Sequence, residues 1–136
     1  RAPIPEKEAT SRVMRANKAK NTKPELILRQ ELFKKGVRGY RIHLEIPGKP
    51  DIAFTKQKLA IFVNGCFWHR CPYCNPPFPK TNSEFWENKF TKNKDRDERK
   101  GYELEDAGWR VLTVWECQIK HDIEEVIQWI KSLLYG

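Results

Sequence analysis

Four cysteines constrain the fold of this 136-residue chain more than any other feature. Cys66, Cys71 and Cys74 have the spacing C-x4-C-x2-C, and Cys117 follows much later, at the end of an apolar stretch. Thiolates at this spacing among turn-forming residues are typical of tetrahedral zinc, and four sulfurs make such a site structural because no position stays open for water. Two disulfides are the alternative. Zinc is favoured because no secretory leader is recognisable and only two residues separate Cys71 from Cys74.

The order of hydrophobic patterns predicts a single α/β domain. Helical periodicity covers residues 22–36, 81–107 and 122–134, and strand patterns cover residues 40–46, 51–54, 59–63 and 109–115. The first strand pattern alternates apolar and polar residues, which predicts one buried face, whereas the third is apolar on both faces and predicts a central strand. Capping boxes are predicted for the first two helices, from Thr22 with Glu25 and from Thr81 with Glu84.

The positive charge is concentrated in the first hundred residues. Residues 1–50 carry a net charge of +8, residues 51–100 carry +4 and residues 101–136 carry −4. Such a surface suits a polyanion such as nucleic acid, because cations placed on phosphates release counterions. A solvated basic face is the alternative. No apolar run approaches the roughly 18 residues that a membrane span needs, so the sequence excludes a membrane protein.

The first 20 residues hold too little apolar material to form a core of their own. They are therefore predicted to be a basic arm or short helix, in which Met14 lies among four cations, namely Arg12, Arg15, Lys18 and Lys20.

Asp51 and His69 are candidates for hydrolytic chemistry. If four thiolates fill a zinc site, His69 inside the cysteine loop is left over and can act as an acid or base. Asp51 opens a predicted strand directly after Pro50. A carboxylate at such a strand edge, with main-chain carbonyls from the next strand, can hold Mg²⁺ over a scissile phosphate. The alternatives are a packing or solvated histidine, and an aspartate that serves only the turn.

Two further groups of residues are unusual for their positions. Asn93 and Asp97 lie on the face of the second predicted helix that should be buried, so they are predicted to have polar partners inside the molecule. The alternative is that the middle of this helix projects into solvent. Phe67, Trp68 and Trp86 suit stacking on bases or wedging between them, and the alternative is that they cover the core beside the zinc site.

Six short motifs occur in order along the chain. They are N-K-A-K-N-T-K-P-E at 17–25, P-G-K-P-D at 47–51, I-F-V-N-G-C-F-W-H at 61–69, K-T-N-S-E-F-W at 80–86, N-K-D-R-D at 93–97 and G-W-R-V-L-T-V-W-E-C at 108–117. Together they resemble the very short patch repair (Vsr) endonucleases. These enzymes recognise the T:G mismatch left by deamination of 5-methylcytosine, and they nick the DNA beside the mismatched thymine.

The resemblance implies a single-domain, restriction-endonuclease-like α/β fold, with a mixed central sheet flanked by helices and a structural zinc site. It implies an Mg²⁺-dependent DNA endonuclease in which Asp51 binds the Mg²⁺ together with the main-chain carbonyl of Val63. His69 would act at the attacking water or the scissile phosphate, with Glu25 and Asp97 in supporting positions.

The resemblance also implies how DNA is held. Phe67, Trp68 and Trp86 would form an aromatic wedge at the mismatch. Residues 1–20, with Met14 and the four cations of the arm, would embrace the other groove, and residues 21–136 would form the catalytic domain.

Two positions depart from the family pattern. Asn64 stands where the best-known members have histidine, and its amide can hydrogen-bond a leaving oxygen but cannot protonate it. The zinc site of those members contains histidine, whereas Cys66, Cys71, Cys74 and Cys117 would make this one all-sulfur.

Two other functions stay open at this point. One is a restriction-type or homing-type endonuclease with a different target, and the other is a zinc-stapled DNA-binding module without catalysis. A monomer is expected, because one T:G site needs no two-fold symmetry. Free thiols and a DNA target indicate the cytoplasm, in association with the bacterial nucleoid.

Overall fold

A four-stranded mixed sheet forms the centre of the computed structural model, which describes residues 21–136. The predicted basic arm at residues 1–20 lies outside the described residues. The strands lie side by side in sequence order, and they are β1 (Arg41–Ile42), β2 (Ile52–Phe54), β3 (Leu59–Asn64) and β4 (Arg110–Trp115). β1, β2 and β3 pair antiparallel, whereas β3 and β4 pair parallel. The predicted mixed α/β architecture is therefore confirmed.

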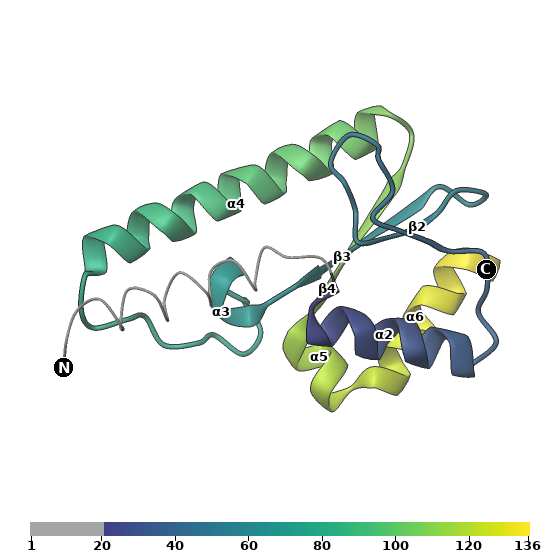
Figure 1. Cartoon of the computed structure of the whole chain (residues 1–136), viewed down its shortest axis with the longest axis horizontal. Helices are drawn as coiled ribbons and strands as arrows, with labels where there is room; N and C mark the ends of the chain where they lie inside the picture. Colours follow the sequence, from purple (N-terminus) through teal and green to yellow (C-terminus); the bar gives the residue numbers. More distant parts are fainter. Residues whose placement is uncertain (1–20) are drawn as a thin grey trace.

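Helices cover both sides of this sheet (Figure 1). On one side lie α2 (Lys23–Lys34), α5 (Glu116–His121) and α6 (Ile123–Tyr135). The main core forms between them and the sheet, and it includes Leu28, Leu32, Ile52, Ile61, Val114, Ile127 and Ile130. β3 lies between β2 and β4 and is covered on both faces of the sheet, as predicted from its apolar residues.

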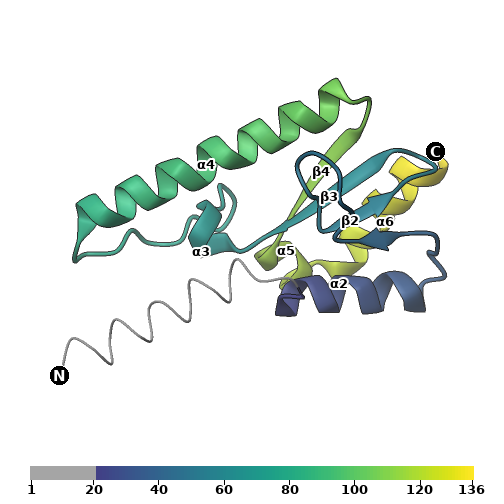
Figure 2. The same ribbon diagram turned by 45° about the horizontal axis from the view of Figure 1, so that its top comes forward.

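The long helix α4 (Ser83–Asp106) lies on the other side and extends well beyond the sheet (Figure 2). Its 24 residues correspond to about 36 Å of helix. The buried Leu104 belongs to the end of α4 that packs on the sheet side, while the other end of the helix lies against α3 (Cys66–His69). One rigid element therefore spans the sheet and the cysteine loop.

The prediction of a seven-residue strand at residues 40–46 is wrong. Only Arg41–Ile42 pairs with β2, because the chain then bends at His43, whose φ is +51°. The Ile46 amide donates to the Leu44 carbonyl, and the Lys49 amide donates to the Ile46 carbonyl, so this segment satisfies its backbone in turns. The alternation over 40–46 does not correspond to one buried face, because Ile42 is exposed and His43 is half-buried.

The two predicted capping boxes are also absent. Neither Thr22 nor Asn82, the residues that precede α2 and α4, makes a side-chain cap hydrogen bond, and α4 begins later than the predicted box at Thr81. The positive φ angles of Gly36 and Gly108 agree with the predicted helix ends. Two short helices, α3 and α5, were not predicted, because four to six residues are too few to show a helical period.

Candidate active site

Asp51 is fixed at the start of β2 by its main chain and its side chain. Its amide donates to the Ile61 carbonyl at 3.0 Å, and its Oδ2 accepts a hydrogen bond of 2.7 Å from the Val63 amide. Burial, reinforced by the nearby Glu25 carboxylate, raises the pKa of Asp51 to about 6, although the Val63 amide, Lys100 and His43 act in the opposite direction. A cation placed beside a buried carboxylate with a raised pKa stabilises its ionised form.

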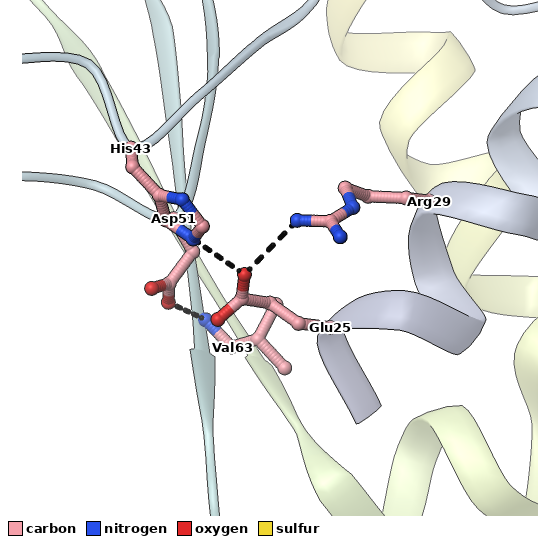
Figure 3. A network of polar contacts seen from close by, with 5 residues as sticks. All are labelled: Glu25, Arg29, His43, Asp51 and Val63. Atoms are coloured by element: carbon pink, nitrogen blue, oxygen red, sulfur yellow. Dashed lines mark hydrogen bonds and ion pairs between the residues drawn. The ribbon is translucent and has the colours of Figure 1, made fainter. Parts of the chain in front are cut away.

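Glu25 faces Asp51 from α2 and is almost completely buried, with 2% of its surface exposed (Figure 3). Its Oε2 lies 2.8 Å from His43 Nε2 and 3.3 Å from Arg29 Nη1. One ligand atom from each of Glu25, His43 and Asp51, two carboxylate oxygens and one imidazole nitrogen, lie within 4.8 Å of one another, so the three side chains could hold a metal ion. The Glu25 side chain therefore contacts His43 and Arg29 and does not form the predicted capping box with Thr22.

His69 and Asp97 form a second polar pair. His69 ends α3, and its Nδ1 lies 2.5 Å from Oδ2 of Asp97 on α4. One turn earlier on α4, the buried Asn93 donates from Nδ2 to the Trp68 carbonyl at 3.0 Å. The polar stripe of the long helix therefore does contact a polar site inside the molecule, as predicted, and its two side chains hold α3 in place.

The two clusters line one cavity of about 240 Å³. Glu25, Asp51, His69 and Asp97 all lie in its wall, together with Asn64 from the end of β3. Four basic side chains border the same cavity, and these are Lys49, Lys89, Arg96 and Lys100. An adjoining hollow of about 570 Å³ shares Asn64, His69 and Asp97 with the first. An anion that enters this region meets basic side chains at the border, and carboxylates and an imidazole inside.

The four cysteines meet beside α3, at the ends of β3 and β4. Their Sγ atoms lie within 4.8 Å of one another, and those of Cys71 and Cys117 are 3.7 Å apart. Sulfurs that share a tetrahedral zinc lie about 3.8 Å apart, whereas a disulfide is about 2.05 Å long. All four are free thiols, which argues against the disulfide alternative. Burial raises the pKa of the Cys66 thiol, so its ionisation requires a cation nearby. The set therefore fits zinc.

An aromatic cluster lies between α3 and α4. The Phe67 ring is 5.2 Å from Trp68 and 5.4 Å from Trp86, measured between centroids. Trp68 is buried, with 7% of its surface exposed, while Phe67 and Trp86 are half-buried. Phe85, which the sequence did not single out, packs on Trp86 and is 49% exposed. The predicted wedge residues are thus brought together, and Phe67 and Trp86 keep part of their surface exposed while Trp68 covers the core.

Two residues of the site were missed from the sequence. His43 falls on the polar side of the alternation over residues 40–46, and Lys100 ends a charged run of the second helix, so neither carries a local signal of a site. His43 lies against Glu25, and Lys100 lines the cavity that contains Asp51. Only the three-dimensional arrangement of α2, α4 and the residues after β1 brings these side chains to one place.

Comparison with known proteins agrees with this geometry. The family model described as DNA mismatch endonuclease Vsr matches residues 3–75. The chain belongs to the Vsr family of DNA endonucleases. It is 41% identical to the Type II nicking enzyme V.NaeI of Lentzea aerocolonigenes, over 98% of this chain and 84% of that protein. It is 37% identical to DNA mismatch endonuclease Vsr of Escherichia coli (strain K12), over 88% of this chain and 76% of that protein.

A solved structure is also similar to this Vsr-family chain. The catalytic domain of homing endonuclease I-Bth0305I aligns with a TM-score of 0.55 and 27% identity, over 83% of this chain and 94% of that one. The predicted family and fold are therefore confirmed, and DNA is the substrate of the family. None of the helices among residues 21–136 is long and apolar enough to cross a membrane.

Proposed function

We propose that this Vsr-family endonuclease nicks one strand of double-stranded DNA beside the thymine of a T:G mismatch, by Mg²⁺-dependent hydrolysis. The observation that carries the proposal is the placement of Asp51 and the His69–Asp97 pair on one cavity bordered by basic side chains. This arrangement separates a cation-binding carboxylate from a proton acceptor, which phosphodiester hydrolysis requires.

Asp51 and the main-chain carbonyl of Val63 are the groups proposed to hold Mg²⁺. When bound there, Mg²⁺ would polarise the scissile phosphate and offset the negative charge that develops on it. The chain prepares the site by holding Asp51 Oδ2 on the Val63 amide. Glu25, which Arg29 and His43 fix on the same side of the cavity, supports this position.

His69 is the proposed general base. If its Nδ1 donates to Asp97, Nε2 keeps its lone pair and can accept a proton from water as the water oxygen attacks phosphorus. The bond between phosphorus and the leaving oxygen then breaks. Asn64 lines the cavity and can donate a hydrogen bond to that oxygen, but the proton that the leaving oxygen acquires must come from solvent.

The aromatic cluster is proposed to select the mismatch. A T:G wobble resists unstacking less than a matched pair does, so a wedge of Phe67, Trp68 and Trp86 discriminates through the energy of opening the base step. The arm at residues 1–20, with Met14, would embrace the other groove while residues 21–136 cut. We expect the protein to act as a monomer in the cytoplasm of a bacterium.

A different DNA target is the second candidate. Several relatives are called Type II nicking enzymes, and the similar solved domain belongs to a homing endonuclease. The catalytic cavity would serve either target, so only the substrate distinguishes these candidates.

The test is a nicking assay on end-labelled duplexes that differ only by T:G or T:A at one position. It compares Mg²⁺ with EDTA, and the wild type with Asp51→Ala and His69→Ala. We expect a Mg²⁺-dependent nick confined to the T strand of the T:G duplex and lost in both variants. Equal cutting of both duplexes would favour the second candidate, and DNA binding without cutting under any condition would contradict the proposed catalysis.

A further inference from the structure

In the proposed reaction, His43 has no role beyond its hydrogen bond to Glu25. It follows β1, and its backbone has a φ of +51°, a left-handed conformation that residues other than glycine rarely adopt. The His43 amide donates to the Asp51 carbonyl at 3.2 Å, so the bend is tied to the residue that carries the proposed metal ligand. Strained backbone that persists beside a functional residue is a reason to look for a role of the side chain.

The His43 imidazole contacts the Glu25 carboxylate and lies close to that of Asp51. Its Nε2 is 2.8 Å from Glu25 Oε2, and one ligand atom each from His43, Glu25 and Asp51 fall within 4.8 Å of one another. Two ligand atoms about 2.1 Å from one ion, at right angles, lie about 3.0 Å apart. The observed separation of Nε2 and Oε2 is therefore close to that of neighbouring ligands of one cation.

We infer that His43 supplies a nitrogen ligand to the cation held beside Asp51 and Glu25, and that this site consequently prefers Mn²⁺ to Mg²⁺. Mg²⁺ takes oxygen ligands and keeps its water, whereas first-row transition ions accept imidazole readily. Arg29 neutralises part of the Glu25 charge, and Lys100 lines the cavity that contains Glu25, so the electrostatic attraction of the site for a metal ion is reduced. A neutral imidazole nitrogen adds affinity for the ion that does not depend on this charge. This inference rests on the proposed function, because it concerns the cation proposed to bind at Asp51.

The alternative is that His43 only positions Glu25 through their hydrogen bond. His43→Gln separates the two roles, since the glutamine amide can still donate to Glu25 but offers no ring nitrogen. His69→Gln is the matched control, because it removes an imidazole that lines the cavity but does not belong to the group of Glu25, His43 and Asp51.

The experiment measures Mn²⁺ binding to the full-length chain, with its cysteine site loaded with zinc, by electron paramagnetic resonance, with Mg²⁺ as competitor. Pulsed measurements on the bound Mn²⁺ report whether a ¹⁴N nucleus is coupled to it. We expect nitrogen coupling in the wild type and in His69→Gln, and its loss in His43→Gln. His43→Gln should also bind Mn²⁺ about tenfold more weakly, with a smaller change in its affinity for Mg²⁺. Asp51→Asn should weaken the binding of both ions.

Absence of nitrogen coupling in the wild type, or its persistence in His43→Gln, would overturn the inference. These readouts do not depend on cleavage. A protein that shows the coupling but nicks no T:G duplex would therefore refute the proposed function while leaving the His43 ligand in place.

Discussion

Among single residues, the Asp51 carboxylate is held where burial destabilises its ionised form. It is half-buried, it accepts one amide hydrogen bond, and it faces the buried Glu25. The pKa of Asp51 rises from 3.8 to about 6, chiefly through burial. The folded protein therefore binds more protons than the unfolded chain between these values, so this carboxylate makes stability fall as the pH rises through that window.

Asp51→Asn should consequently stabilise the protein when no Mg²⁺ is added. The amide keeps an oxygen for the Val63 amide but never ionises, so the variant avoids burying a charge. We expect a gain of the order of 1 to 3 kcal/mol at pH 7.5 that shrinks towards pH 4. Thermal unfolding at several pH values measures it, with the exposed Asp95→Asn as control. A gain that is the same at pH 4 and pH 7.5 would contradict the assignment to Asp51 ionisation.

Asp97→Asn tests the pair formed by His69 and Asp97. The substitution keeps the shape of the side chain but removes its charge, and the new amide can donate to His69 Nδ1 as well as accept from it, so the tautomer with Nε2 free to accept a proton is no longer favoured. We expect the single-turnover nicking rate to fall by about 10² to 10⁴ with little change in DNA affinity. Asp95→Asn, on the exposed face of the same helix, should leave both unchanged. A variant that loses DNA binding and nicking together would show a structural role instead.

At the scale of elements, the turn that leads into β2 is pressed against α4. A Cβ added at Gly48 would lie 3.0 Å from the Leu104 side chain and 3.1 Å from the Lys100 carbonyl, and the φ of Gly48 is +86°. The turn carries Lys49 and Pro50 directly into Asp51. Close packing at one glycine therefore sets the distance between the proposed metal ligand and the helix that positions His69.

Gly48→Ala should lower the free energy of unfolding and slow nicking. Gly39→Ala is the matched control, because Gly39 has a φ of +87° but open space where its Cβ would be. Both variants bear the cost of the left-handed backbone, and only the first adds the clash, so we expect Gly48→Ala to be less stable by about 1 to 3 kcal/mol than Gly39→Ala. Chemical denaturation of the two variants measures this difference, and equal stabilities would show that α4 moves away without penalty.

The same elements show how far the sequence could predict the fold and the site. Long periodic segments such as α4 and α6 were predicted because each side-chain pattern repeats over several turns. Glu25 was predicted at a site by resemblance, yet local rules gave it a cap, since no local rule includes the contact with His43, 18 residues away. His43 itself was missed because its role comes from a bend that ends β1 after two residues.

At the scale of the whole molecule, the cysteine cluster joins parts of the chain that are distant in sequence. Cys117 follows β4, while Cys66, Cys71 and Cys74 lie in and after α3, which carries His69. The parallel pairing of β3 with β4 brings Asn64 opposite Trp115, so both strands end beside this cluster. A zinc ion there would close a loop of about fifty residues that includes all of α4.

Removal of that zinc should therefore loosen α3 and α4 together. We expect a strong chelator to release one zinc per chain, to lower the unfolding temperature, and to weaken the near-ultraviolet circular dichroism signal of the packed rings of Trp68 and Trp86. Zinc release is measured with a colorimetric dye, and addition of zinc should restore the signal. An unchanged unfolding temperature after complete release would show that the cluster is not structural.

The straightness of α4 also has a consequence for the product of the reaction. Trp86, in the proposed wedge, and Asp97, which holds His69, are eleven residues apart on one uninterrupted helix, a separation of about 16 Å along its axis. If the wedge reads the mismatch and His69 acts at the cut, as proposed, an unbroken helix keeps these two points at a fixed distance. The register of the cut is then set by helix geometry rather than by the local sequence, so the broken strands should share a single, uniform end.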